Sequence, residues 1–265
     1  MRLNGVRKIA LVAIAAATAL SLTGCGQLGS TNPRLKSIAQ AAPEPTPTPT
    51  PTATVPEEPD PAPVDPGPAP CPTGDFQTEV EQALAQIGNY GHITVDGVQS
   101  AQDCATIIAF QTRMGIEPAD GTPGPTTKDV AERIAATDPS QCPYSDAAQA
   151  CVDLTHQTFY ITKQGTVVLG PTVTRTGMPG YATPSGDFHI SGRALSEWSV
   201  PFSVWLPYWQ NFYMGDGLHE TTTYIHNKSI GSHGCVNLLH QDAVAAYGLL
   251  TSGSVVHLYG RRPGT

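Results

Sequence analysis

A cysteine and a histidine sixteen positions apart are the residues of this sequence best suited to covalent chemistry. They are Cys235, in the stretch GSHGCVNL, and His219. A thiol attacks a carbonyl only as its thiolate, and an ordinary cysteine is mostly protonated at neutral pH. A nearby histidine could accept the thiol proton and later return it to a leaving amine. Attack on a carbonyl also creates a tetrahedral intermediate with a negatively charged oxygen. Because glycine has no Cβ to block the approach, the main-chain amides of Gly234 and Cys235 could donate hydrogen bonds to this oxyanion.

The other five cysteines are expected to be modified or paired. An even set of four could form two disulfides in an oxidising compartment, with three possible pairings left open. We expect these bridges to fix how two domains meet, since three of the four lie beside segment boundaries. The set is Cys71, Cys104, Cys142 and Cys151. Cys235 is left over, and since an unpaired exported thiol risks oxidation, its retention favours a chemical role.

Residues 1–24 have the layout of a secretory signal peptide. Arg2, Arg7 and Lys8 precede an apolar run over residues 9–22, which is too short to span a bilayer comfortably. The run ends in Leu-Thr-Gly-Cys25, which resembles the lipobox of bacterial lipoproteins. This resemblance implies cleavage before Cys25, lipid on its thiol, and an extracytoplasmic protein anchored to the cell membrane; ordinary secretion is the alternative.

The charge balance argues against nucleic acid as a partner. Removal of residues 1–24 takes away three positive charges and no negative ones, so the net charge changes from -8 to -11. Proteins that bind nucleic acid usually carry an excess of lysine and arginine, which neutralise the phosphates. An acidic surface also lacks attraction to anionic lipids, so membrane attachment would depend on acyl chains at Cys25.

Residues 25–72 read as a lipidated N-terminus followed by a proline-rich linker. Proline recurs at nearly every second position over residues 42–70, which favours extended polyproline II and disfavours a packed core. At roughly 3.1 Å per residue the linker could reach on the order of 100 Å from the membrane. It could thus carry the folded part into the cell wall, or be a disordered segment of no particular reach.

Residues 73–140 predict a small domain of three helices. Apolar positions recur with helical spacing, and Asp96-Gly97 and Asp120-Gly121 mark turns between the helices. These turns, with Phe110-Gln111, resemble the peptidoglycan-binding domain of many wall enzymes, which implies glycan as a partner. The first repeat departs from that pattern at three positions, so a spacer that kept the fold is the alternative; they are Ser100, Asp103 and Thr106.

Residues 148–262 predict a mostly β domain, β-sandwich-like and of the α+β class. Short β-type runs are expected at 158–162, 166–169, 172–176, 188–191 and 254–259, and 224–226 also reads as a strand. Gln164-Gly165 is expected to form a hairpin turn. One helix is expected over about 241–250. The whole chain is therefore predicted to be multidomain, with the helical domain preceding the β domain.

Three motifs of the β domain resemble the L,D-transpeptidases, the wall enzymes that cross-link peptidoglycan with a cysteine. They are Ser232-His-Gly-Cys-Val-Asn237, Thr183-Pro-Ser-Gly-Asp-Phe188 and the segment Phe212 to His219. The resemblance implies that Cys235 attacks the third-residue carbonyl of a tetrapeptide stem and expels D-alanine. An amine of a neighbouring stem then resolves the thioester. The resemblance also implies inhibition by carbapenems and a reaction that uses no cofactor or metal.

The same resemblance implies roles for individual residues. His219 is the base, in preference to His226, and the main-chain carbonyl of Glu220 orients it. His233 and Gly234 shape the pocket and the oxyanion hole, while Ser232 and Asn237 belong to the substrate-binding loop. An aromatic-rich approach could line the stem-peptide groove or simply cover the sheet; it comprises Trp205, Tyr208, Trp209, Tyr213 and Met214, of which Tyr213 and Met214 are assigned to substrate binding.

Three other functions are left open. Water as the acceptor would make the enzyme an L,D-carboxypeptidase. A zinc site could be built from His219, His226, His233 and Cys235, although their spacing matches no common zinc motif. The third alternative is a non-catalytic wall-binding lipoprotein that kept the fold.

Overall fold

The computed structural model describes residues 71–221 and 223–265. The expected signal peptide, the lipidation site Cys25 and the proline-rich linker lie outside these residues. None of the described helices is both long enough and apolar enough to cross a membrane.

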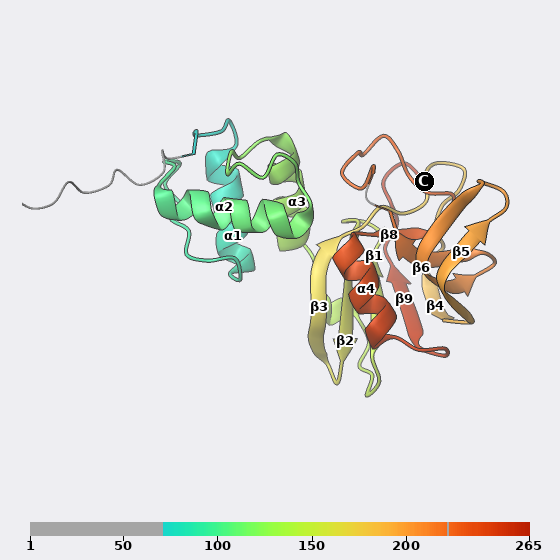
Figure 1. Ribbon diagram of the computed structural model, residues 1–265. Coiled ribbons are helices and arrows are strands. Elements are labelled where there is room, and N and C mark those ends of the chain that lie inside the picture. Colours follow the sequence, from blue (N-terminus) through green and yellow to red (C-terminus); the bar gives the residue numbers. More distant parts are fainter. Residues whose placement is uncertain (1–70, 222) are drawn as a thin grey trace, which may run out of the picture. The chain divides into compact units, whose positions relative to one another are not determined.

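The N-terminal part of the described chain is the expected three-helix unit. Its helices are α1 (Gln77–Ile87), α2 (Ala101–Met114) and α3 (Pro125–Ala135) (Figure 1). Each helix sends apolar side chains into one cluster, which includes the fully buried Val80, Phe110 and Val130. The periodic apolar positions of the sequence therefore meet in a common core.

Polar side chains at the motif positions hold the turns of this unit. Gln111 is buried, and its Oε1 accepts a hydrogen bond from the Gly121 amide at 2.8 Å. Ser100 and Asp103, two of the three departures from the family pattern, form a reciprocal capping box at the start of α2. Thr106, the third, donates to a main-chain carbonyl 2.7 Å away. The departures thus have structural roles of their own.

The C-terminal part contains two sheets and a helix. The five-stranded sheet has the order β3-β2-β1-β9-β4, and the four-stranded sheet has the order β5-β6-β7-β8 (Figure 1). The elements are β1 (Gln149–Asp153), β2 (Thr158–Lys163), β3 (Thr166–Val173), β4 (Gly186–His189), β5 (Gly192–Ser199), β6 (Val204–Tyr213), β7 (Asp216–Glu220), β8 (Val236–Leu238), α4 (His240–Leu249) and β9 (Val255–Tyr259).

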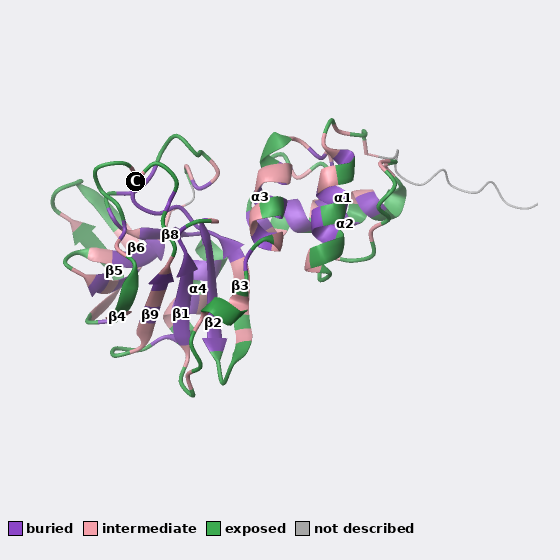
Figure 2. Cartoon of the chain, turned by 180° about the vertical axis from the view of Figure 1, so that it is seen from behind, coloured by how far each residue is buried: buried purple, intermediate pink, exposed green. Residues whose placement is uncertain are grey.

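Both sheets and α4 contribute to one hydrophobic core. Phe159 and Leu258 come from the five-stranded sheet, Leu218 and Val236 from the four-stranded sheet, and Ala246 from α4. The purple colour of β1 in Figure 2 shows how completely this central strand is buried. The β-sandwich-like, α+β class expected from the sequence is confirmed.

The structure confirms the expected hairpin turn, joins two of the expected strands into one, and contains strands that the sequence did not predict. Gln164 and Gly165 both have positive φ, at 51° and 73°, as the turn between β2 and β3 requires. The runs 166–169 and 172–176 form a single strand, β3, which ends at Val173. The strands β1, β5 and most of β6 had no clear alternating pattern, because β1 is buried on both faces and β5 is largely exposed.

The expectation of a strand at Tyr224, Ile225 and His226 is wrong, because these residues form a turn. The Asn227 amide donates to the Tyr224 carbonyl at 2.9 Å. The Ile225 carbonyl accepts from the Arg175 guanidinium at 2.9 Å. These main-chain carbonyls therefore accept hydrogen bonds from the turn and from an arginine, and they are not paired with a neighbouring strand.

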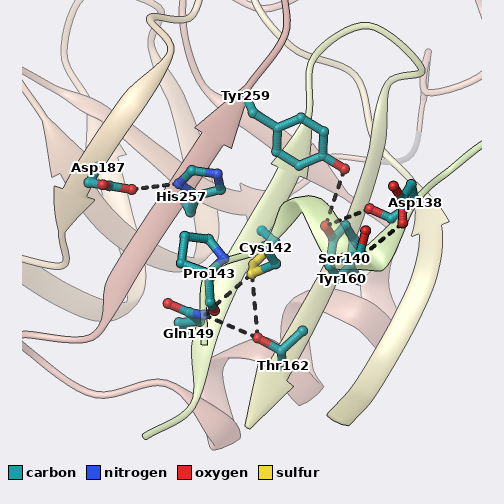
Figure 3. Close-up of a disulfide and its surroundings, with 11 residues drawn as sticks. Asp138, Ser140, Cys142, Pro143, Gln149, Tyr160, Thr162, Asp187, His257 and Tyr259 are labelled. Carbon is teal, nitrogen blue, oxygen red and sulfur yellow. Dashed lines mark hydrogen bonds and ion pairs between the residues drawn. A yellow bond between two sulfur atoms is a disulfide. The ribbon is translucent and has the colours of Figure 1, made fainter. Parts of the chain in front are cut away.

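The disulfides lie within segments and do not join the two domains, contrary to expectation. Cys71 pairs with Cys104 of α2, and Cys142 pairs with Cys151 of β1. Figure 3 shows the surroundings of the second bridge, where Gln149 and Thr162 approach the Cys142 sulfur at 3.4 Å. Cys142 follows the helical unit closely, so its bridge fixes the connecting segment to the sheet.

An ion pair links the helical part to the β part. All the described residues belong to one compact unit. Arg113 of α2 makes two hydrogen bonds to Asp242 of α4, at 2.7 and 3.2 Å. Thr172 donates to the same carboxylate at 2.6 Å. Since Asp242 is almost fully buried, these bonds satisfy a charge that would otherwise be costly to bury.

Candidate active site

Two neighbouring parallel strands bring His219 and Cys235 together. In the register of β7 and β8, Leu218 lies opposite Val236 and His219 lies opposite Asn237. Cys235 directly precedes β8, so the register continues to place it beside Gly217, two positions before His219 and on the same face of the strand pair. Both residues line one cavity of about 390 Å³. The pairing of two strands that are distant in sequence thus places a thiol and an imidazole in one site.

The His219 imidazole is held in one orientation and kept neutral. Its Nδ1 lies 2.9 Å from the main-chain carbonyl of Glu220, so the proton on Nδ1 is donated there and Nε2 can accept a proton. The Thr221 hydroxyl donates to the same carbonyl at 2.6 Å. Burial lowers the pKa of His219 below its usual value, although the Glu220 carbonyl and carboxylate oppose this. A neutral imidazole is the form that a general base requires.

Cys235 is the one cysteine of the described residues that is outside a disulfide. Burial raises the pKa of its thiol to about 11, the nearby Asp216 adds to this rise, and a hydrogen bond with the Gly217 main chain opposes it. No hydrogen bond recorded for residues 71–221 and 223–265 joins its sulfur to the His219 ring. The thiol is therefore protonated at neutral pH, and it must give up its proton to react.

Asp216 is a cavity residue that sequence reasoning missed. Its carboxylate lies so close to Gly234 that a Cβ at position 234 would overlap it, and Gly234 also has a φ of 124°. Burial raises the pKa of Asp216 to about 6. Asp216 lies within the motif segment Phe212 to His219, but the motif assigned it no role, because its approach to Gly234 depends on the strand pairing.

We predict that Asp216→Asn accelerates acylation of Cys235 above pH 7. Asp216 is ionised above its pKa of about 6, and its negative charge disfavours the thiolate. Removing that charge should increase the rate at pH 8 by about fivefold, on the order of 1 kcal/mol. The ratio of variant to wild-type rates, measured by stopped-flow fluorescence with a carbapenem, should fall towards one at pH 5. A ratio that is the same at both pH values would contradict the prediction.

The motif loop is fixed by its own hydrogen bonds. Ser232 Oγ donates to the Cys235 carbonyl at 2.5 Å and accepts from the Gly234 amide at 3.1 Å. Thr183, from the second motif, donates to the Gly234 carbonyl at 2.6 Å. Two of the motifs recognised in the sequence thus meet here. Because the Gly234 amide already has a partner, the Cys235 amide is the better placed of the two candidates for an oxyanion.

Aromatic side chains form one wall of the cavity. The exposed His233 ring packs against the rings of Tyr181 and Phe202, each with a centroid distance of 4.4 Å. Phe202, Trp205 and His233 line the cavity. Phe202 was not among the residues expected from the sequence.

The other members of the expected aromatic approach lie outside the cavity lining. Met214 is 90% exposed, and Tyr213 packs beside Phe188 with a ring-centroid distance of 5.0 Å. Tyr208 packs beside His240. Trp209 lies beside the His219 ring at 5.9 Å, so it supports the imidazole from outside the cavity.

Asn237 connects the motif to a tyrosine of the cavity. Asn237 is fully buried, and its Nδ2 donates to the Tyr224 hydroxyl at 2.7 Å. Tyr224 lines the cavity. Burial raises the Tyr224 pKa, although the hydrogen bond from Asn237 opposes this, so the phenol remains protonated. No local pattern indicated a role for Tyr224, because its position depends on the turn that replaced the expected strand.

His226 does not share this site. Its Nε2 lies 3.0 Å from the Gly115 carbonyl at the end of α2, and it is not among the residues that line the cavity. The proposed zinc ligands therefore do not all converge. Within the described part of the chain, no group of three or more histidine, cysteine, aspartate or glutamate residues is arranged to hold a metal ion.

A thiol and an oriented imidazole in one cavity are the groups that cysteine-dependent acyl-transfer enzymes use. Residues 147–258 match the model of the YkuD L,D-transpeptidase catalytic domain, and residues 73–130 match a peptidoglycan binding domain. A crystal structure of an L,D-transpeptidase from Stackebrandtia nassauensis is 48% identical, with a TM-score of 0.71, over 75% of this chain and 100% of that chain. The chain belongs to the L,D-transpeptidase family.

Two further solved L,D-transpeptidases are less similar to this chain. One from Xylanimonas cellulosilytica is 22% identical over 72% of this chain and 99% of that chain, with a TM-score of 0.41. L,D-transpeptidase 3 from Mycobacterium tuberculosis, solved with a faropenem-derived adduct, is 17% identical over 43% of this chain and 60% of that chain, with a TM-score of 0.37. A search of curated proteins found no match.

Proposed function

We propose that this L,D-transpeptidase cross-links peptidoglycan through a thioester on Cys235. The observation that carries the proposal is the shared cavity of Cys235 and a neutral His219 whose Nδ1 is bonded to the Glu220 carbonyl. Membership of the family supports the substrate class, because the matched domains are an L,D-transpeptidase catalytic domain and a peptidoglycan binding domain.

The first half-reaction forms the thioester. The Cys235 sulfur attacks the carbonyl carbon of the third stem residue as the thiol proton passes to His219 Nε2. The Cys235 amide donates to the oxyanion, and Tyr224 offers a second donor within the cavity. When the intermediate collapses, the carbon–nitrogen bond breaks. His219 returns the proton to the leaving amine of D-alanine.

The second half-reaction resolves the thioester. An amine of a neighbouring stem attacks the thioester carbonyl and transfers a proton to His219. The carbon–sulfur bond then breaks, and the proton returns to sulfur, so that Cys235 and His219 regain their starting forms. Phe202 and Trp205 line the same cavity, and both are more than half exposed, so the stem peptides can reach them.

The products formed from tetrapeptide muropeptides test this proposal. Mass spectrometry of the purified protein's reaction should show dimers joined between third residues, together with free D-alanine. Trimmed tripeptide monomers without dimers would instead identify an L,D-carboxypeptidase. If neither product forms while metal analysis finds zinc in the protein, the proposed thiol chemistry is wrong.

The helical domain is proposed to hold glycan strands near the active site. The match of residues 73–130 to a peptidoglycan binding domain supports this, whereas the structural roles of Ser100 and Asp103 favour a spacer. Co-sedimentation of the full chain with insoluble glycan stripped of its stem peptides distinguishes the two. If the chain does not sediment with the glycan, the helical domain is a structural spacer.

Attachment to the membrane through lipid on Cys25 is proposed from the sequence alone. The lipobox-like residues 22–25 support it. Cys25→Ala should move the protein from the membrane fraction to the soluble fraction when bacteria expressing it are lysed. An unchanged membrane fraction would contradict lipid anchoring.

A further inference from the structure

A second cavity, of about 250 Å³, lies apart from the proposed active site and has no lining residue in common with it. Four cationic side chains and one carboxylate face it; they are Arg133, Arg175, Lys228, Arg262 and Asp129. The cavity therefore has three more positive than negative charges. The chain as a whole has a net charge of -8, so this concentration of positive charge does not follow from the overall composition.

Two of the guanidinium groups are almost completely buried. Arg175 is 2% exposed and Arg262 is 7% exposed. Burial, followed by the charges of Arg133 and Arg262, lowers the pKa of Arg175 to about 10. All three guanidinium groups line the same cavity, so their positive charges repel one another. Like charges in a buried site are costly unless an opposite charge compensates for them.

The carboxylates at or near the cavity compensate for only part of this charge, of which Asp129 offsets some at Arg175. Asp129 is shared between Arg133, at 3.1 Å, and Lys228. Asp153 lies nearby but binds the His156 ring at 2.7 Å, and it does not line the cavity. Neither carboxylate makes an ion pair with Arg175 or Arg262 among the described residues.

Main-chain carbonyls hold the arginines in place without neutralising them. Arg175 donates through Nε and Nη2 to the Ile225 carbonyl, at 3.1 and 2.9 Å. Arg262 donates to the carbonyls of Thr176, at 2.6 Å, and Ile230, at 2.8 Å. No hydrogen bond recorded for the described part of the chain uses Nη1 of Arg175. The site is thus rigid, positively charged and provided with an unused donor.

We propose that this cavity binds a phosphoryl oxyanion. Guanidinium groups match the oxygens of phosphate in geometry and charge, and preorganised donors reduce the cost of binding. Lys228, which is 68% exposed at the side chain, stands at the mouth of the cavity. The bound oxyanion would join α3 to the segment that leads to Ser232, since Arg262 already holds the Lys228 and Ile230 carbonyls of that segment.

Isothermal titration of the full mature chain with inorganic phosphate, at constant ionic strength in sodium chloride, tests the proposal. We expect saturable binding of one phosphate per chain and at least tenfold weaker binding of acetate. Lys228→Gln should weaken the phosphate affinity by about tenfold, the loss of one charge-assisted contact. Lys163→Gln is the matched control, because Lys163 is also exposed but does not line the cavity. This substitution removes the same charge, and the phosphate affinity of the variant should equal that of the wild-type protein.

Three results would overturn the proposal. They are no saturable phosphate binding, equal binding of acetate, and equal losses in the two lysine variants, which would indicate a general charge effect. Thermal unfolding of Lys228→Gln verifies that the variant is folded. A parallel titration with a glycerol phosphodiester distinguishes the source: tighter binding of the diester identifies a phosphate-containing polymer, and tighter binding of inorganic phosphate identifies a free ion.

Discussion

Cys235→Ala is expected to abolish both acylation by a carbapenem and formation of cross-linked dimers. In the wild-type protein, the thiol adds across the β-lactam amide, so the intact mass should increase by that of one inhibitor molecule with no leaving group lost. Cys235 is the one cysteine outside a disulfide among the described residues, so no other thiol there can substitute for it. Intact-mass spectrometry after exposure to the inhibitor measures the effect.

The alanine variant should otherwise resemble the wild-type protein. The Ser232 hydroxyl binds the main chain of Cys235 rather than its sulfur, so the substitution removes only the hydrogen bond between the thiol and the Gly217 main chain. The midpoint of thermal unfolding should therefore change little. A folded variant that still gains the mass of the inhibitor would disprove the nucleophile assignment.

His219→Gln is expected to reduce the rate of acylation at pH 7 by about 10²- to 10⁴-fold, the usual contribution of a general base. Glutamine can still donate to the Glu220 carbonyl, but it has no basic nitrogen to accept the thiol proton. Because burial holds the thiol pKa near 11, very little thiolate forms without a base. Stopped-flow fluorescence with a carbapenem measures the rate directly.

His226→Gln is the matched control for this experiment. His226 binds the Gly115 carbonyl and lies outside the cavity lining, so its variant should keep a rate within about twofold of the wild type. A large loss of acylation rate in His226→Gln, together with a small loss in His219→Gln, would identify His226 as the base instead of His219.

The two groups central to the chemistry could be predicted from the sequence because short motifs contain them. Cys235 follows a Ser-His-Gly motif, and the main-chain partner of His219 is its immediate neighbour Glu220. Local motifs also predicted the hairpin turn at Gln164-Gly165 and the helical unit. These features depend on residues that are close in sequence, so their spacing carries the information.

The rest of the site depends on contacts between distant segments. Asp216 approaches Gly234 through strand pairing, Phe202 reaches His233 from the β5–β6 connection, and Tyr224 is held by Asn237. None of these pairs is marked by a local pattern. The disulfide pairing was likewise open in the sequence, since four cysteines allow three pairings.

The pH dependence of carbapenem acylation, compared between the wild-type protein and His219→Gln, is the most direct test that His219 activates Cys235. The wild-type rate should rise through a pKa below the usual histidine value, because burial lowers it, and then reach a plateau near neutral pH. The variant rate should instead keep rising tenfold per pH unit towards the thiol pKa of about 11, so that the difference narrows as the solution becomes more basic. Profiles that run parallel over the whole range would contradict activation of the sulfur by this imidazole.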